Sequence, residues 1–295
     1  MLHCFICNAN PFQTNFERDL HCFLEKQRKN VAFFENNAYL GRKNSNMSIN
    51  GVITWDIVDS TSIPIEKRTG LLECMSSVLD DIKLSYSISF DYFRGDSVQI
   101  VVDNPSDSLV VSILFWVGLK VKTEKELSIM CDVRLSVGIG MTEFLGGNVN
   151  VSDGEAFRLS GRALDQMGKS TFCLSTPWEE INEEFGVSLP FVDDIVSGLT
   201  TGQASALYYS LLKNLTKKEI ASVMGQTSQN VSRLLILAKE KQIRNLINRF
   251  RTVITSSGTG DRSVSCPFGC NTVFNFGFRQ INLYILNNFV SNNLV

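Results

Sequence analysis

The chain has 295 residues, of which 44% are hydrophobic and 20% are charged, and its formal net charge is −2. Its mean hydropathy is +0.04. This balance is typical of a folded, water-soluble protein and excludes a disordered chain, collagen and a disulfide-rich miniprotein. At about 100–200 residues per domain, the length predicts two domains.

Neither a membrane span nor a secretory signal is expected. The longest apolar run, Ser108 to Leu119, is shorter than the about 20 residues that cross a bilayer, and polar residues interrupt it. The N-terminus has no basic region before its apolar residues and no small-residue cleavage site. We therefore expect a cytoplasmic protein.

The eight cysteines are expected to be reduced thiols. Cys4 and Cys7, followed by His21 and Cys22, offer a spacing that superficially suits zinc. Adjacent His and Cys rarely both turn toward one metal, and the sequence has no second CxxC pair. No zinc is expected.

Taken in order, the chain begins with an N-terminal extension, residues 1–46, to which the sequence assigns no role. A natural start at Met47 is an open alternative. Residues 47–178 then alternate between strand and helix periods. The expected elements are a strand at 51–58, a helix at 64–84, strands at 87–93 and 97–102, a helix at 104–120, a strand at 132–139, a helix at 154–167 and a strand at 171–174.

This βαββαβ order, followed by αβ, predicts an α+β domain with a ferredoxin-like antiparallel sheet and helices on one face. In such a sheet the first strand lies beside the third. Asp56 ends the first strand, and Asp96 lies in the turn before the third. The two carboxylates are therefore predicted to converge on a divalent cation, Mg²⁺ or Mn²⁺, with phosphates completing its coordination.

Four segments resemble the ordered motifs of class III nucleotidyl cyclase domains: DIVDSTS (56–62), FRGDSVQ (93–99), RLSVGIG (134–140) and GEAFRLSGRALD (154–165). The second and fourth also resemble the wording of SatD-type bacterial proteins. The resemblance implies a nucleoside triphosphate substrate, two metal ions held by Asp56 and Asp96, and a homodimer whose helix at 154–167 contributes Arg158 and Arg162 across the interface. The family has Asn at the position of Arg158.

The same resemblance implies nucleotide contacts from the loop after the first strand and from the hairpin. Purine cyclases usually read the base with Lys three residues before the Gly-Asp pair, where this chain has Tyr92. Arg94 and Arg134 are candidates either for phosphate contacts or for surface salt bridges. The predicted nucleotide-binding residues are Ser60, Thr61, Tyr92 and Arg94.

A purely structural alternative stays open for the acidic pair. Asp at a strand end and Asp after Gly in a hairpin are both common for reasons of turn conformation alone. On that alternative the domain is a scaffold that binds no nucleotide.

A basic region follows an acidic linker at 179–198. Residues 199–251 include nine basic and two acidic residues, which gives this region a net charge of +7. Such a concentration is the electrostatic signature of a surface that meets phosphates. Residues 199–251 are therefore predicted to form a DNA-binding domain.

The pattern within this region is typical of a helix-turn-helix. Thr216 and Glu219 form a capping box that starts a short helix, Gly225 ends it, and a second helix begins near Ser228. With a helix before it and the long LLILAKEKQIRNLINRF helix behind it, the region resembles sigma factor region four.

The second of these helices is expected to enter the major groove of double-stranded DNA. Lys217, Lys218 and Lys239 are predicted to contact phosphates. Docking to another protein is the alternative, because this shape also suits protein contacts. The predicted base-reading residues are Ser228, Gln229, Asn230, Ser232 and Arg233.

The remaining segment, residues 252–295, is a tail that the sequence leaves open as a strand pair, a docking segment or an unselected extension. Together these features predict a bacterial DNA-binding transcription regulator with a cyclase-like domain that binds a metal nucleotide and sets the dimer. An active nucleotidyl cyclase, with the helix-turn-helix as its targeting module, is the alternative.

Overall fold

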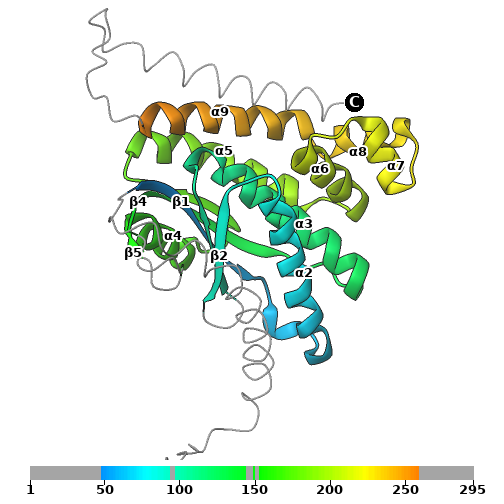
Figure 1. Ribbon diagram of the computed structural model, residues 1–295, viewed down its shortest axis with the longest axis horizontal. Helices are drawn as coiled ribbons and strands as arrows, with labels where there is room; N and C mark the ends of the chain where they lie inside the picture. The colour runs from blue at the N-terminus through cyan, green and yellow to red at the C-terminus, as the bar shows by residue number, and fades with distance from the viewer. Residues whose placement is uncertain (1–47, 94–96, 144–148, 150–152, 259–295) are drawn as a thin grey trace, which may run out of the picture. The chain divides into compact units, whose positions relative to one another are not determined.

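The computed structural model describes residues 48–93, 97–143, 149 and 153–258 (Figure 1). The predicted extension at 1–46, the hairpin turn at 94–96 and most of the predicted tail therefore lie outside the described residues. The described residues up to Ile254 belong to one compact unit.

A six-stranded sheet forms the centre of this unit. Its strand order is β2-β3-β1-β4-β5, and β6 pairs with β4. The pairs are antiparallel except for β4 with β6. The first strand lies beside the third, as the predicted topology requires. The strands are β1 (Ser48–Ile57), β2 (Ile88–Phe93), β3 (Ser97–Val102), β4 (Val133–Glu143), β5 (Asp153–Gly154) and β6 (Phe172–Ser175).

Helices cover both faces of this sheet, whereas the sequence predicted helices on one face. Side chains alternate along β1, so that Ile53 and Trp55 enter the main core with α2 (Ile65–Lys83) and α3 (Ser108–Leu127). Val52 instead belongs to a separate cluster with Phe157 of α4 (Glu155–Gln166). Figure 1 shows α4 on the opposite side of β1 and β4 from α5 and α9.

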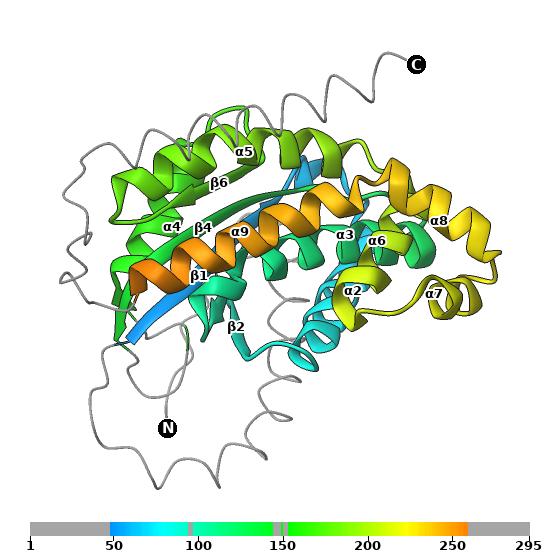
Figure 2. The ribbon, with the colours of Figure 1, turned by 90° about the horizontal axis from the view of Figure 1, so that it is seen from above.

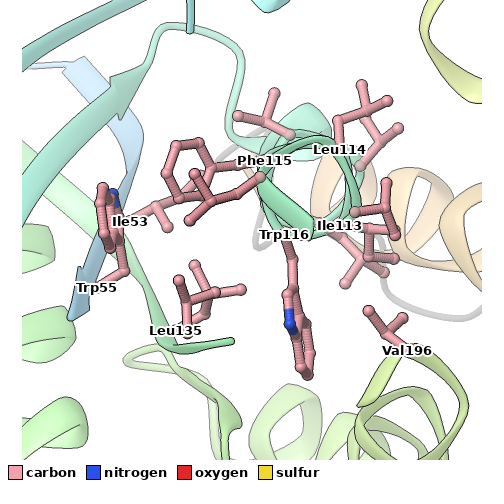
Figure 3. Close-up of a cluster of buried hydrophobic side chains, with 14 of the residues drawn as sticks. Ile53, Trp55, Ile113, Leu114, Phe115, Trp116, Leu135 and Val196 are labelled. Carbon is pink, nitrogen blue, oxygen red and sulfur yellow. The ribbon is translucent and has the colours of Figure 1, made fainter. Parts of the chain in front are cut away.

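Helix α3 is buried around its whole circumference. Every residue from Ser108 to Lys120 is buried, and the side chains in Figure 3 point from this helix in all directions. Phe115 stacks on Trp55 of β1 with ring centroids 4.5 Å apart, while Trp116 meets Phe172 of β6 edge to face. The helix continues seven residues beyond the predicted end at Lys120 and follows a short 3₁₀ turn, η2 (Pro105–Asp107).

The predicted acidic linker is a helix, α5 (Glu179–Ser197). Ile181, Phe185 and Leu189 recur at four-residue spacing and are buried in the main core. None of its acidic residues is buried, so the apolar side is free to pack. The sequence predicted a linker for this acidic segment, whereas it forms an amphipathic helix.

Four further helices follow: α6 (Thr201–Lys213), α7 (Lys217–Met224), α8 (Ser228–Leu237) and α9 (Glu240–Gly258). The predicted capping box of Thr216 and Glu219 is present, and Gly225 ends α7 at a φ of 62°. That conformation suits glycine because it has no Cβ. The long helix predicted after α8 is interrupted instead, since Lys239 has a φ of 53°.

These helices share their core with the sheet. Tyr208 of α6 packs against Gly118 of α3, where an added Cβ would lie 2.7 Å from the Tyr208 ring. The Tyr208 hydroxyl donates to Asp81 of α2 at 3.1 Å. One continuous hydrophobic cluster contains residues of the sheet, α2, α3, α5, α6 and α9. The packing therefore has no break at the predicted boundary near residue 199.

Helix α9 is fastened to the same unit by two ion pairs. Arg249 binds Glu184 of α5 at 2.7 Å, and Arg251 binds Asp107 of η2 at 2.8 Å. Phe250 stacks edge to face on Phe185. Figure 2 shows α9 crossing β1 and β4 when seen from above.

A buried lysine joins α3, β4 and the end of α5. Lys120 is 2% exposed, and its ammonium group donates to Asp132 at 3.1 Å and to the Ser197 carbonyl at 3.0 Å. Asp132 also accepts from the Trp116 indole. No helix in the described ranges has the length and apolarity that a membrane crossing requires.

Replacement of Lys120 by Ala should destabilise the whole unit. Asp132 would lose its charge partner, and the change would also leave a cavity, at a combined cost of about 2 kcal/mol in the free energy of unfolding. Urea titrations followed by tryptophan fluorescence and by far-ultraviolet circular dichroism measure this loss. Lys125→Ala, at an exposed position of the same helix, is the control. Equal stability of the two variants would contradict the role given to Lys120.

Candidate functional site

Asp56, the first predicted metal ligand, lies near the end of β1 on the face that α4 covers. Its direct cross-strand partner on β4 is Arg134. The Arg134 Nε donates to Oδ1 of Asp56 at 3.0 Å, and the Nη2 donates to Oδ2. The Asp56 side chain is 25% exposed and the Arg134 side chain is 38% exposed. The carboxylate is thus reachable from solvent but engaged through both oxygens.

A second carboxylate, Asp165 of α4, is near enough to Arg134 to act on its charge. The hydrogen bond to Asp56 is the largest cause that raises the pKa of Arg134, and the charge of Asp165 raises it further. Arg134 therefore lies in a field set by two acidic residues, one on the sheet and one on the helix.

The seat of α4 depends on two glycines of β4. A Cβ at Gly138 would lie 2.2 Å from the Ala156 carbonyl oxygen and 2.6 Å from the Ser160 amide nitrogen. A Cβ at Gly140 would meet the Glu155 side chain at 2.8 Å. The VGIG sequence thus gives the helix backbone room to approach the strand.

A buried hydroxyl pair fixes the helix on the sheet. Ser160 of α4 is fully buried, and its hydroxyl lies 2.8 Å from that of Thr54 on β1. Thr54 also accepts from Gln99 of β3 at 3.5 Å. Ser160 therefore has a packing role, and Thr54 points to the same face as Asp56.

The predicted catalytic arginines lie on the exposed side of α4. Arg158 is exposed and pairs with Asp153 at 3.0 Å, and Arg162 is exposed one turn further along. Because residues four and seven apart share a helix face, Arg158, Arg162 and Asp165 form one stripe. Arg162 is the nearer of the two arginines to Asp165 along the helix, about 4.5 Å in axial rise.

The loop after β1 carries Ser60 and Thr61 in a single 3₁₀ turn, η1 (Ser60–Ser62). Asp59 precedes it in the left-handed conformation, with a φ of 51°. The Val58 amide donates to the Asp132 carbonyl at 3.0 Å, which fixes the start of the loop beside β4. Thr61 is exposed and Ser60 partly exposed, so both are reachable from solvent close to Asp56 in the chain.

Tyr92 does not join this site. It is the cross-strand partner of Val98, which is itself opposite Trp55, so Tyr92 shares the α2-facing side of the sheet. It packs against the main core, and burial raises the pKa of its hydroxyl to about 12. The alternation of side chains along a strand places it on the face opposite Asp56.

Two predicted residues, Arg94 and Asp96, lie outside the described residues. The described part of β3 begins at Ser97, and the register places Val98 opposite Trp55. Within the described ranges, no three His, Cys, Asp or Glu side chains are grouped so that they could hold a metal ion. The convergence of Asp56 and Asp96 therefore stays a prediction.

The predicted DNA-contacting residues lie on α7, on α8 and just after α8. Lys217 donates to Ser232 at 3.0 Å, and Asn230 donates to Gln226 at 2.8 Å. Ser228 begins α8, while Lys239 is partly buried after its end. The exposed members of the set are Lys217, Lys218, Gln229 and Arg233.

Some of the basic charge that predicted a phosphate-binding surface is used inside the protein. Arg244 binds Glu240 and the Ser210 carbonyl, while Arg249 and Arg251 anchor α9. The sequence could not distinguish Arg249 and Arg251 from surface arginines, because their partners Glu184 and Asp107 are distant in the chain.

The sequence predicts no role for Asp165. It leaves Arg134 as a candidate either for a phosphate contact or for a surface salt bridge. Helical spacing from Arg158 and Arg162 was the available signal for Asp165. As a chemical set, the described residues offer a hard oxygen ligand for a divalent cation and guanidinium groups for phosphate oxygens.

No family model matches the chain, and no curated protein matches it. Among solved structures, a bacterial light-regulated adenylyl cyclase matches at 13% identity with a TM-score of 0.37 over 57% of each chain. The adenylyl cyclase CyaB from P. aeruginosa matches at 18% identity with a TM-score of 0.32, covering 41% of this chain and 74% of that one. This chain thus spans 57% of the first cyclase's length, and similarity at this level assigns no activity.

A methyl group at Gly138 should displace α4. Gly138→Ala puts a Cβ against backbone atoms of the helix, and we expect about 3 kcal/mol of destabilisation. Gly161→Ala is the matched control, since a Cβ there meets nothing within 4 Å and alanine favours a helix by up to about 1 kcal/mol. Urea denaturation measures both. If Gly138→Ala were as stable as the wild type, the close approach of α4 to β4 would be wrong.

Proposed function

We propose that the protein binds a nucleoside triphosphate together with Mg²⁺ or Mn²⁺ on the α4 face of its sheet and converts it to a cyclic nucleotide, releasing pyrophosphate. The observation that carries this proposal is the β2-β3-β1-β4 order. It places Asp56 on a central strand, on the sheet face that α4 covers, and beside β3, which begins directly after Asp96.

The donor chemistry at Asp56 fits the cation. A partly exposed carboxylate is a hard oxygen ligand, and Asp96 is the predicted second one. When bound, the cation would neutralise phosphate charge and favour ionisation of the attacking 3′-hydroxyl. Ser60, Thr61 and Arg94 are the proposed phosphate contacts.

The exposed stripe on α4 supports a dimer in which Arg158 and Arg162 serve the partner's site. Both arginines are exposed, and within the described residues the ion-pair partner of Arg158 is a solvent-exposed carboxylate, Asp153. Exposed pairs of this kind contribute little, so the arginine can exchange Asp153 for a phosphate at small cost. A homodimer is therefore part of the proposal.

Loss of the Asp56 carboxylate should weaken nucleotide binding. We expect Asp56→Asn to weaken binding of each triphosphate with Mn²⁺ at least about tenfold, because one charged ligand is lost. Isothermal calorimetry measures the affinity, and a pyrophosphate assay measures turnover.

The control is Asp59→Asn, three residues further along. Asp59 is exposed and has a positive φ that Asn also tolerates. Its binding should equal that of the wild type. Equal binding by Asp56→Asn and wild type, or no triphosphate binding by the wild type, would reject the proposed site.

DNA binding by α7 and α8 is a second candidate function. It is favoured by the exposed Lys217, Lys218 and Arg233 on two capped helices joined at Gly225, with α8 beginning at its own Thr227 cap. On this proposal Lys217 and Lys218 contact phosphates, while Gln229 and Arg233 reach base edges. Lys239 is a weaker candidate because it is partly buried.

Replacement of both Lys217 and Lys218 by Ala should reduce the salt dependence of DNA binding. Each lost phosphate contact lowers the slope of log affinity against log salt by about 0.9. Fluorescence anisotropy with a random-sequence duplex over a salt series gives this slope. Lys169→Ala, an exposed lysine between α4 and β6, should leave it unchanged. A wild-type protein with no salt-dependent affinity for the duplex would exclude this second function.

A further inference from the structure

Arg134 binds Asp56, the carboxylate that is predicted to hold the cation. Its guanidinium group engages both carboxylate oxygens of Asp56, in a geometry that two strictly opposed positions of β1 and β4 enforce. A carboxylate bound in this way accepts one hydrogen bond on each oxygen from the guanidinium, so a cation must compete for the same oxygens. The positive charge of Arg134 also repels a cation that approaches.

Arg134 has an alternative environment within the site. Asp165 of α4 acts on it electrostatically, and Arg162 lies three residues before Asp165 on the same exposed stripe. Arg134 is 38% exposed, so its side chain can leave Asp56 without disrupting a core. Once released, it remains on the α4 face, where the phosphates of the proposed substrate would lie.

We propose that Arg134 is an internal counterion that holds Asp56 in the empty site and yields it only to a cation that arrives with a polyphosphate. This inference rests on the proposed function. A free cation competes with Arg134 for Asp56 and brings no new anion to Arg134. A cation–triphosphate complex brings a charge partner for each residue of the ion pair, since the cation binds Asp56 and a phosphate binds Arg134. Arg134 thus selects the complex over the free metal.

The test compares Mn²⁺ alone with Mn²⁺–tripolyphosphate, a probe that needs no knowledge of the base. Both affinities are measured on the full chain by calorimetry, with electron paramagnetic resonance for free Mn²⁺. In Arg134→Gln, Mn²⁺ alone should bind about fivefold more tightly and the complex about fivefold more weakly, as expected for one partly exposed charge. A purely structural role would not move the two affinities in opposite directions.

Three further variants keep the test decisive. Arg134→Lys should shift both affinities in the same directions as Arg134→Gln but by smaller factors, because lysine keeps the charge and loses the bidentate geometry. Arg249→Gln removes an arginine from a comparable ion pair elsewhere and should change neither affinity. Asp56→Asn should remove the tighter Mn²⁺ binding when combined with Arg134→Gln.

The outcomes separate the two proposals. Unchanged or weaker Mn²⁺ binding in Arg134→Gln would overturn the counterion role, even if the wild type binds the complex. Tighter Mn²⁺ binding in this variant, without binding of the complex by the wild type, would support the counterion pair but reject selection of the complex and the proposed function with it.

Discussion

The structure depends on the burial of one helix around its whole circumference. An apolar helix with no solvent face must be covered on every side, and a sheet covers only one. For α3 the sheet provides Ile53 and Trp55, while α2, α5 and α6 enclose the rest. The sheet and the C-terminal helices therefore have to form one core. Lys120, the charged residue at the end of the buried stretch, is accommodated because Asp132 and the Ser197 carbonyl complete its bonding.

Much of this fold could be predicted from local sequence signals. The amphipathic period of α2, the capping box at Thr216 and the glycine at 225 each act within a few residues, so their patterns are visible in the chain. The predominantly apolar run of α3 was also visible in the sequence, and a helix of this composition needs cover on all sides. The packing of α6 against α3 was not predicted, because the contact joins residues far apart in sequence. For α5, the prediction of a linker relied on the acidic composition and overlooked the regular four-residue spacing of buried apolar residues.

The candidate site shows the same division between local and distant information. Asp56 could be predicted because a carboxylate at a strand end is a local feature. Tyr92 was assigned to the site by family resemblance, although its position on an alternating strand already placed it with Trp55 on the other face. The Arg134 pairing depends on the register between β1 and β4, which no local pattern fixes. The glycines of β4 were part of the matched motif, but their reason, the approach of α4, required the structure.

The contact between Gly118 of α3 and Tyr208 of α6 also constrains how such a protein can evolve. Gene fusion and recombination readily exchange domains whose mutual surface is small and polar. Here a cut at Gly198 would uncover the side of α3 that Tyr208 now covers, and an apolar surface left in water promotes aggregation. Because the two halves share one hydrophobic core, a recombination event that separates them should destabilise both. A Cβ at Gly118 would lie 2.7 Å from Tyr208 and 2.9 Å from Val78, so a larger residue there requires matched changes in both α6 and α2.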